Sequence, residues 1–211
     1  QAVDPVRPEP LQPHIALMDL LSGVSMPLLD THRQRRRGVL LAAGAALIAT
    51  PTLHVHAQAQ AATRRPTPAQ TEGPFYPIAL PADSDADLLV NGAMRYSRGQ
   101  PAWVDGSVSD LDGRPVRGAS VEIWQCDDQG HYHHPGDGNR ADRAFQGFGR
   151  VAVDSEGRFR FRTIRPVAYG GRAPHIHVKV KLASRELLTT QLYVRGDPGN
   201  ARDSLWRSLR S

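Results

Sequence analysis

The stretch that decides the fold reads Tyr169-Gly170-Gly171-Arg172-Ala173-Pro174-His175-Ile176-His177-Val178-Lys179-Val180. Its second half alternates polar and apolar side chains, which is the period of a β-strand. Side chains at i and i+2 of a strand share one face, about 7 Å apart, so His175 and His177 lie next to each other. Ile176 and Val178 then face the opposite way, into a core. Two imidazoles on one strand face provide half of a metal site.

A turn precedes this strand, because the two glycines and Pro174 favour chain reversal. The turn brings Tyr169 and Arg172 towards the two histidines. The His-x-His spacing alone is weak evidence for a metal site, since His54-Val55-His56 has the same spacing in a segment of a different character. The rest of the chain therefore has to decide between a metal site and two histidines that merely share a strand.

Further strand-like segments follow one another at regular spacing through the second half of the chain. Each is short, alternates in polarity and ends in an Asp/Gly turn such as Asp112-Gly113. The expected strands cover residues 102–110, 120–125, 149–154, 158–164, 175–182 and 188–194. Such a series is typical of a sandwich or barrel, and the one helical pattern, at 203–209, is short. We therefore expect an all-β fold, an antiparallel β-sandwich with long functional loops, preceded by a signal peptide.

The N-terminal part has the character of an export signal. Arg36-Arg37 precedes an apolar run at 39–49, which is too short to span a bilayer but matches the apolar part of a signal peptide. Alanines between 57 and 62 offer cleavage sites, and the arginine pair resembles a twin-arginine leader. Met26 would begin a leader of ordinary proportions. We expect an exported protein, periplasmic or secreted, with no stable membrane insertion once the leader is removed.

The formal net charge of +5 raises nucleic acid as a partner, but the distribution of charge argues against it. The one dense basic run, Arg33-Gln34-Arg35-Arg36-Arg37, has no interleaved aromatic residues and belongs to the leader. No nucleic-acid partner is expected. Cys126 is the only cysteine, which excludes an internal disulfide and suits a small buried hydrophobe. The domain must therefore rest on its core or on a metal.

Three segments between the strands have distinct characters. Residues 63–81 are rich in proline and predict an extended arm, within which 71–77 holds too many aromatic residues for a plain linker. Residues 83–98, including Tyr96, are polar and predict a loop. Residues 127–148 predict a long loop that carries Gly130-His131-Tyr132-His133-His134-Pro135. Long ordered loops on a rigid sandwich usually carry function.

Six motifs occur in order along the chain: E-G-P-F-Y-P (72–77), V-E-I-W-Q-C-D-x-x-G-x-Y (121–132), F-Q-G-F-G-R (145–150), T-I-R-P-x-x-Y (163–169), R-x-P-H-I-H (172–177) and L-T-T-Q-L-Y (188–193). Together they resemble the intradiol ring-cleavage dioxygenases, closest to the iron-bearing (beta) chain of protocatechuate 3,4-dioxygenase and its exported relatives. The likeness covers roughly residues 71–200. Several motifs in the right order are far more specific than any one of them.

The resemblance implies a mononuclear non-haem Fe(III) held by Tyr132, Tyr169, His175 and His177. A phenolate is a hard, charged oxygen donor that suits ferric iron, and so strong a cation depresses the pKa of a phenol from about 10. In the family the second tyrosine, here Tyr169, leaves the metal when the substrate arrives and takes up a proton. Tyr169 is therefore expected to act as ligand and as base, while Tyr132 stays bound.

Further positions complete the site that the resemblance implies. Arg172 matches a catalytic and substrate-binding arginine, whose cation stabilises charge developing on a bound catecholate ring. Gln191 matches a glutamine that we count with the catalytic residues. Tyr193 shares a strand face with Gln191 and is the rival to Tyr169 as a ligand. The substrate-binding loop of the family corresponds to Gly73, Pro74 and Phe75.

The resemblance also implies the reaction and the partners. A small catechol-type aromatic diol is opened by O2 between its two hydroxyl-bearing carbons to give a cis,cis-muconate-type diacid, and the family forms oligomers. The chain then divides into residues 1–61, an N-terminal extension with a twin-arginine-like signal peptide, and 62–101, the proline-rich arm and substrate-side loop. Residues 102–211 form the β-sandwich ferric dioxygenase core.

Two other interpretations fit the same residues. An exported copper or zinc β-sandwich protein would combine His175 and His177 with His131, His133 or His134. A non-catalytic sandwich module would carry only the remnant of a site. Colour separates the three, because phenolate-to-Fe(III) charge transfer gives a red-brown protein, copper sites are blue or green, and zinc or empty sites are colourless.

Overall fold

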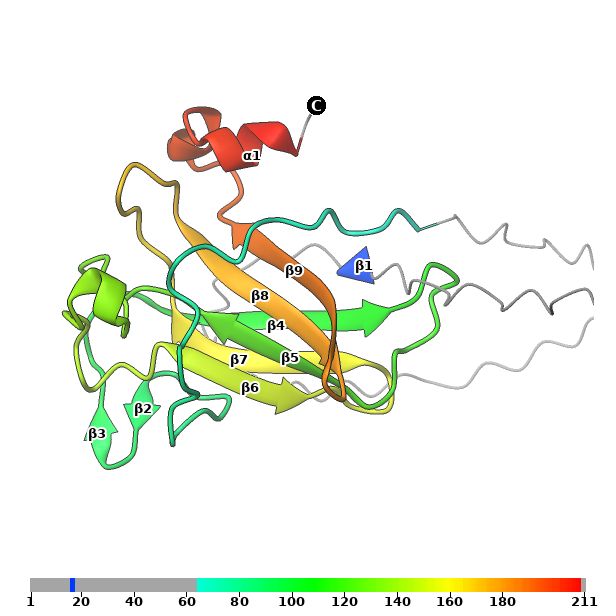
Figure 1. Cartoon of the computed structure of the whole chain (residues 1–211), viewed down its shortest axis with the longest axis horizontal. Helices are drawn as coiled ribbons and strands as arrows, with labels where there is room; N and C mark the ends of the chain where they lie inside the picture. The colour runs from blue at the N-terminus through cyan, green and yellow to red at the C-terminus, as the bar shows by residue number, and fades with distance from the viewer. Residues whose placement is uncertain (1–15, 18–63, 210–211) are drawn as a thin grey trace, which may run out of the picture. The chain divides into compact units, whose positions relative to one another are not determined.

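The computed structural model describes residues 16–17 and 64–209, all within one structural unit (Figure 1). The expected export leader lies outside these residues, so the signal peptide and the twin-arginine route stay predictions. The described part is almost entirely β. None of its helices has both the length and the apolar character needed to cross a membrane.

Two antiparallel sheets make up the domain (Figure 1). The larger has the strand order β6-β5-β8-β9, with bounds Phe148–Ala152, Ala119–Trp124, His175–Leu182 and Arg185–Tyr193. The smaller has the order β1-β4-β7, with bounds Ala16–Leu17, Pro101–Ser109 and Arg158–Ile164. A separate hairpin pairs β2 (Val90–Asn91) with β3 (Met94–Arg95). The other elements are two 3-10 turns, η1 (Pro135–Asp137) and η2 (Pro198–Ala201), and the short helix α1 (Ser204–Ser208).

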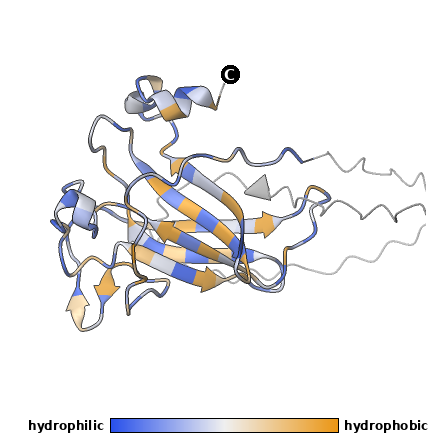
Figure 2. Cartoon of the chain, in the orientation of Figure 1, coloured by the Kyte–Doolittle hydropathy of each residue, from blue (hydrophilic) through white to orange (hydrophobic). Residues whose placement is uncertain are grey.

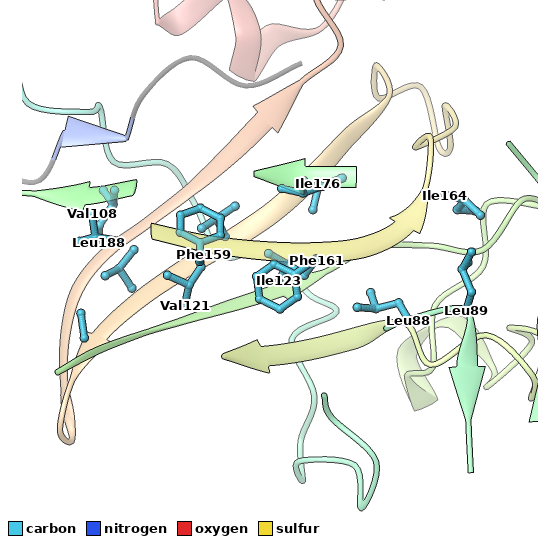
Figure 3. Packing of buried hydrophobic residues seen from close by; sticks show 14 of the residues in the cluster. Leu88, Leu89, Val108, Val121, Ile123, Phe159, Phe161, Ile164, Ile176 and Leu188 are labelled. Carbon is cyan, nitrogen blue, oxygen red and sulfur yellow. The ribbon is translucent and has the colours of Figure 1, made fainter. Parts of the chain in front are cut away.

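The hydrophobic core lies between the two sheets (Figure 3). Apolar and polar residues alternate along the main strands, which Figure 2 shows as orange and blue bands. One face of each sheet thereby supplies the core. Its strand residues include Val104, Val108, Val121, Ile123, Phe159, Phe161, Ile176, Val178, Val180 and Leu188. The expected antiparallel β-sandwich is confirmed.

The expected elements agree closely with the observed ones. Strands 158–164 and 175–182 coincide with β7 and β8, and the other four differ at their ends by one to three residues. In β8, Ile176 and Val178 face the core as expected, and Cys126 is fully buried. The helical pattern at 203–209 becomes α1, with Asp203 as its N-cap.

The prediction of a plain polar loop at 83–98 is wrong. This segment contains the hairpin of β2 and β3 and sends Leu88, Leu89 and Tyr96 into the core. The ring of Tyr96 packs 5.0 Å from that of Phe145, and its hydroxyl bonds to the carboxylate of Asp128. Scattered apolar side chains among polar ones carry no strand period, so the pattern concealed their burial.

The outer face of the larger sheet is covered by the proline-rich arm. The arm first follows the edge strand β9, where the hydroxyl of Thr190 donates to the carbonyl of Pro68 over 2.8 Å. The ammonium group of Lys179, nearly buried, pairs with the carboxylate of Glu72 and lies 3.7 Å from the centre of the Tyr76 ring. The arm therefore seals the sheet face on which the two histidines lie.

Candidate metal centre

Two histidines of β8 and two tyrosines from loops converge on this covered face. Nε2 of His175 lies 3.2 Å from Nε2 of His177 and 3.3 Å from the hydroxyl of Tyr169. The ring of Tyr132 meets those of Tyr169 and His177 edge to face, with centroids 5.1 Å and 6.1 Å apart. The structure thus brings together all four residues that the sequence suggested as ligands, while their role stays a prediction.

Burial sets the protonation state of the two histidines. Burial lowers the pKa of His175 to about 4. Burial, together with repulsion from His175 once that ring is protonated, lowers the pKa of His177 to about 2. Nδ1 of His175 lies 2.6 Å from the carbonyl oxygen of Ala173, which only a protonated nitrogen can approach in this way. Its Nε2 therefore keeps a lone pair. Both rings are neutral at neutral pH, which is the metal-binding form of imidazole.

A loop organised by carboxylates positions Tyr132. Asp127 accepts the backbone N–H of Asp142 over 2.8 Å, and Asp137 of η1 accepts that of Tyr132 itself over 2.8 Å. The ring of Phe75, from the arm, stacks on the Tyr132 ring with centroids 4.6 Å apart and planes at 22°. The phenol is consequently fixed from both its backbone and its ring.

A tight turn positions Tyr169. The N–H of Arg172 donates to the Tyr169 carbonyl over 2.7 Å and closes the turn. Gly170 and Gly171 between them have φ of 51° and 79°, a left-handed conformation that glycine adopts without strain. The turn expected before β8 is confirmed, and it directs Tyr169 at the histidine pair.

The four donors fit a cation such as ferric iron. Burial raises the pKa of both phenols, that of Tyr132 well above its usual range. The Tyr132 hydroxyl is buried and makes no hydrogen bond with any described residue, so a bound cation would satisfy it and stabilise its phenolate. Two donors that bind one ion at about 2.1 Å, at angles of about 90–109°, lie about 3.0–3.4 Å apart. The separations of 3.2 and 3.3 Å around His175 fall in this range.

Arg172 lies beside the four donors and is held by three acceptors. Its Nε donates to Asp203 over 2.8 Å, and its Nη2 donates to Oε1 of Gln191 over 2.6 Å and to the hydroxyl of Tyr193 over 3.0 Å. Gln191 is itself oriented, because its Nε2 donates to the Thr71 carbonyl over 3.0 Å. Burial has the larger effect on the pKa of the four donor side chains, raising it for the two tyrosines and lowering it for the two histidines. The positive charge of Arg172 acts to lower the pKa of all four. A fixed cation therefore faces the centre.

Tyr193, the rival ligand, belongs to the arginine network. Its hydroxyl donates to Gln191 over 3.0 Å and accepts from Arg172, although its ring lies 5.8 Å from that of His175. The expectation that Tyr193 and Gln191 share a strand face is confirmed. The structure gives the Tyr193 oxygen partners other than the four donors.

The arm residues expected to form the substrate-side loop lie against the centre. Gly73 has φ of 74°, and a Cβ at this position would lie 3.3 Å from Cε1 of His177. Phe75 stacks on Tyr132, whereas Pro74, which lies between Gly73 and Phe75 in the sequence, is exposed. That these residues contact a substrate stays a prediction.

Gly73→Ala is expected to destabilise the domain and to disturb His177. The left-handed backbone costs a residue with a Cβ about 1–2 kcal/mol, and the tight contact with the imidazole adds to that cost. Gly92→Ala is a matched control, because Gly92 also has positive φ, 58°, but nothing lies within 4 Å of its Cβ position. Urea denaturation should show a larger loss of unfolding free energy for Gly73→Ala. Equal losses in both variants would contradict the contact.

The histidines of the copper or zinc alternative have other partners. Nε2 of His133 lies 2.6 Å from the Phe145 carbonyl, and Nδ1 of His134 accepts the N–H of Gly136 over 3.0 Å. In the part of the chain that the structure describes, no three or more His, Cys, Asp or Glu side chains form a group that could hold a metal. The structure gives no support to a centre built from these histidines.

Sequence reasoning missed two residues that shape the site. Trp124 stacks on His177 with centroids 4.8 Å apart and planes at 10°, because the two residues are register partners in β5 and β8. Strand alternation indicates that Trp124 faces away from the core, but not which residue it meets. Asp203 carried only the signal of a helix start, and no local pattern reveals its contact with Arg172, 31 residues earlier.

The fold and the site together define a β-sandwich with a centre of two tyrosines and two histidines. A family model described as dioxygenase matches residues 71–211. The protocatechuate 3,4-dioxygenase beta chain of Burkholderia cepacia is 40% identical over 136 residues, which are 58% of this chain and 57% of that protein. Hydroxyquinol 1,2-dioxygenase of Corynebacterium glutamicum is 32% identical over 150 residues, which are 63% of this chain and 47% of that protein.

Solved structures give the same result. Hydroxyquinol 1,2-dioxygenase from Pseudomonas putida superposes with a TM-score of 0.53 and 27% identity, over 66% of this chain and 52% of that chain. The chain belongs to the intradiol ring-cleavage dioxygenase family. It spans about half the length of the curated relatives it matches.

Proposed function

We propose that this protein opens the ring of a catechol-type aromatic diol with O2, between the two carbons that carry the hydroxyl groups. The product is a cis,cis-muconate-type diacid, and both atoms of O2 enter it. The observation that carries the proposal is the convergence of two phenol oxygens and two imidazole nitrogens beside a fixed guanidinium. Family membership supports the same reaction class.

Tyr132, Tyr169, His175 and His177 would hold a mononuclear Fe(III). Neutral imidazoles and ionisable phenols are a donor set that favours the ferric over the ferrous ion, in contrast to the two histidines and one carboxylate of non-haem Fe(II) oxygenases. When bound, the ion would supply a Lewis acid that engages both diol oxygens and activates the ring towards O2.

The protein's own residues orient the substrate and manage charge. As the phenolate that a bound cation would stabilise, Tyr169 would take a proton from a substrate hydroxyl. The guanidinium of Arg172 stabilises negative charge that develops on the ring. Phe75 and Trp124 cover the donors with aromatic carbon, and His175 and His177 are almost completely inaccessible to solvent. A site closed in this way strengthens each electrostatic contact.

The test is aerobic incubation of the full chain, loaded with ferric iron, with catechol, hydroxyquinol and protocatechuate. Loss of ring absorbance should match O2 uptake at one O2 per diol, and the protein should be red-brown. Hydroquinone, whose hydroxyl groups are not adjacent, is the control and should not react. Absence of O2 uptake with every adjacent diol would contradict the proposal.

We also propose that the protein is exported by the twin-arginine route. The support is the sequence alone: Arg36-Arg37, the short apolar run and the alanine-rich cleavage region. Mass spectrometry of periplasmic or secreted material should find an N-terminus between residues 57 and 62. Soluble cytoplasmic protein that retains the intact leader would contradict this.

A further inference from the structure

Asp203 is a buried carboxylate that belongs to no motif of the site. It lies at the N-terminus of α1, and its side chain is completely inaccessible to solvent. Oδ1 accepts the backbone N–H groups of Leu205 and Trp206 over 2.9 and 3.2 Å. Oδ2 accepts Nε of Arg172 over 2.8 Å and the N–H of Ala173 over 2.9 Å. All four acceptor positions of the carboxylate are therefore used.

Capping a helix does not explain a buried charge at this position. Neutral asparagine and serine cap helix N-termini about as well as aspartate does, and the cap of α1 uses only one of the two oxygens. A buried carboxylate without a cationic partner is strongly disfavoured. Burial alone would raise the pKa of Asp203, but the hydrogen bonds from Ala173 and Arg172 outweigh it and the pKa lies below its usual value. The negative charge of Asp203 is therefore compensated by the positive charge of Arg172.

The contacts of Arg172 other than that with Asp203 do not fix the orientation of its guanidinium. Gln191 and Tyr193 on β9 both accept from Nη2, so they hold one corner of the guanidinium. Asp203 accepts from Nε, a second nitrogen of the planar group. Contacts at two nitrogens fix the orientation of a planar group, whereas contacts at one nitrogen leave it free to pivot about that nitrogen. The same carboxylate oxygen also anchors Ala173, whose carbonyl sets the tautomer of His175.

We propose that Asp203 is a positioning residue for Arg172. It fixes the guanidinium in the orientation in which its charge faces the four donors, and it ties the C-terminal segment of 197–209 to the site. Two further contacts support this tie: Nε2 of Gln70 in the arm donates to the Leu205 carbonyl over 2.9 Å, and Trp206 packs 5.0 Å from the ring of Tyr193. The catalytic part of the inference rests on the proposed function, whereas the positioning part does not.

The first experiment needs no activity. In the full chain without added metal, the Arg172 Nε–H proton should exchange with water at least about tenfold more slowly than that of Arg158 at the start of β7, whose Nε also donates to a carboxylate, that of Asp154, but in an exposed position. The Arg172 signal is assigned by its loss in Arg172→Lys. Asp203→Asn should remove the protection, while Asp197→Asn, which alters the cap of η2 in the same segment, should keep it. An unprotected Arg172 proton in the unaltered protein would overturn the proposal.

The second experiment is a double-mutant cycle in the iron-loaded protein. Asp203→Asn should lower kcat/KM about 10- to 100-fold, the usual effect of losing a charged hydrogen bond, and Asp197→Asn should leave it unchanged. In an Arg172→Gln background, Asp203→Asn should have little further effect, because its partner is already gone. An equal loss in both backgrounds would show that Asp203 acts independently of Arg172 and would overturn the proposal. Should Asp203→Asn not fold, Asp203→Ser keeps a good cap and replaces it in the cycle.

The two experiments separate this inference from the proposed function. If no adjacent diol is cleaved, the function fails, yet proton exchange still decides whether Asp203 fixes Arg172. If diols are cleaved and Asp203→Asn has the kcat/KM of the unaltered protein, the positioning role fails and the function stands.

Discussion

Tyr132→Phe is expected to remove most of the red-brown colour of the iron-loaded protein and to lower ring cleavage by more than about a hundredfold. Phenylalanine preserves the stacking on Phe75 but deletes the buried oxygen that no described residue hydrogen-bonds. If Tyr132 is a ligand as proposed, the charge-transfer band and that ligand are lost together, whereas the sandwich stays folded. Visible absorbance, iron content and O2 uptake, measured on one preparation, test this expectation.

Two companion variants show that the effect is specific. Tyr193→Phe should stay coloured and keep turning over, because the Tyr193 hydroxyl bonds to Gln191 and Arg172 and not to the donors. Tyr169→Phe should retain some iron with a shifted colour and turn over slowly, because it loses a ligand and the proton acceptor together. If Tyr193→Phe bleaches the protein while Tyr169→Phe does not, the ligand assignment is wrong.

Arg172→Ala should keep its iron and lose about a hundredfold in turnover, equivalent to about 3 kcal/mol of transition-state stabilisation. The guanidinium acts on charge developing in the substrate, so its removal spares the metal. It also leaves the buried carboxylate of Asp203 without its cation, so the free energy of unfolding should fall by about 3 kcal/mol. Steady-state kinetics well below the melting temperature, iron analysis and urea denaturation measure the three quantities.

Arg158→Ala is the matched control for this prediction. Arg158, at the start of β7, is an exposed arginine paired with Asp154 and Glu156 of the preceding turn, and an exposed ion pair contributes little. Its removal should change neither turnover nor stability appreciably. Unaltered turnover in Arg172→Ala, or loss of its iron, would show that the role of Arg172 is wrongly assigned.

Much of the fold could be predicted because polar and apolar residues alternate along the main strands. The strands at 158–164 and 175–182 alternate without interruption and are bounded by turn residues, so their period and ends are visible in the sequence. The segment at 83–98 has no such period. Its hairpin strands have two residues each, and Leu88 and Tyr96 are buried by the packing of distant elements against them. That kind of burial depends on tertiary structure and leaves no local pattern.

Some residues of the site could likewise be predicted from the sequence, and others could not. His175 and His177 were visible as partners because two residues on one strand must share a face. Tyr132 emerged only from the resemblance of several motifs, since a long loop does not reveal where it points, whereas the turn before β8 indicated that Tyr169 approaches the histidines. The contact of Trp124 with His177 depends on the pairing of β5 with β8, and that of Asp203 with Arg172 on the return of the C-terminal segment. Both require the folded structure.

The most direct test of the account follows the two atoms of O2. The iron-loaded full chain is incubated with catechol under O2 labelled with oxygen-18, and the product is analysed by mass spectrometry. The account predicts cis,cis-muconate with one labelled oxygen in each carboxylate, because the bond between the two hydroxyl-bearing carbons is the one that opens. An unlabelled product, or a yellow semialdehyde from opening of the bond beside the diol, would contradict it.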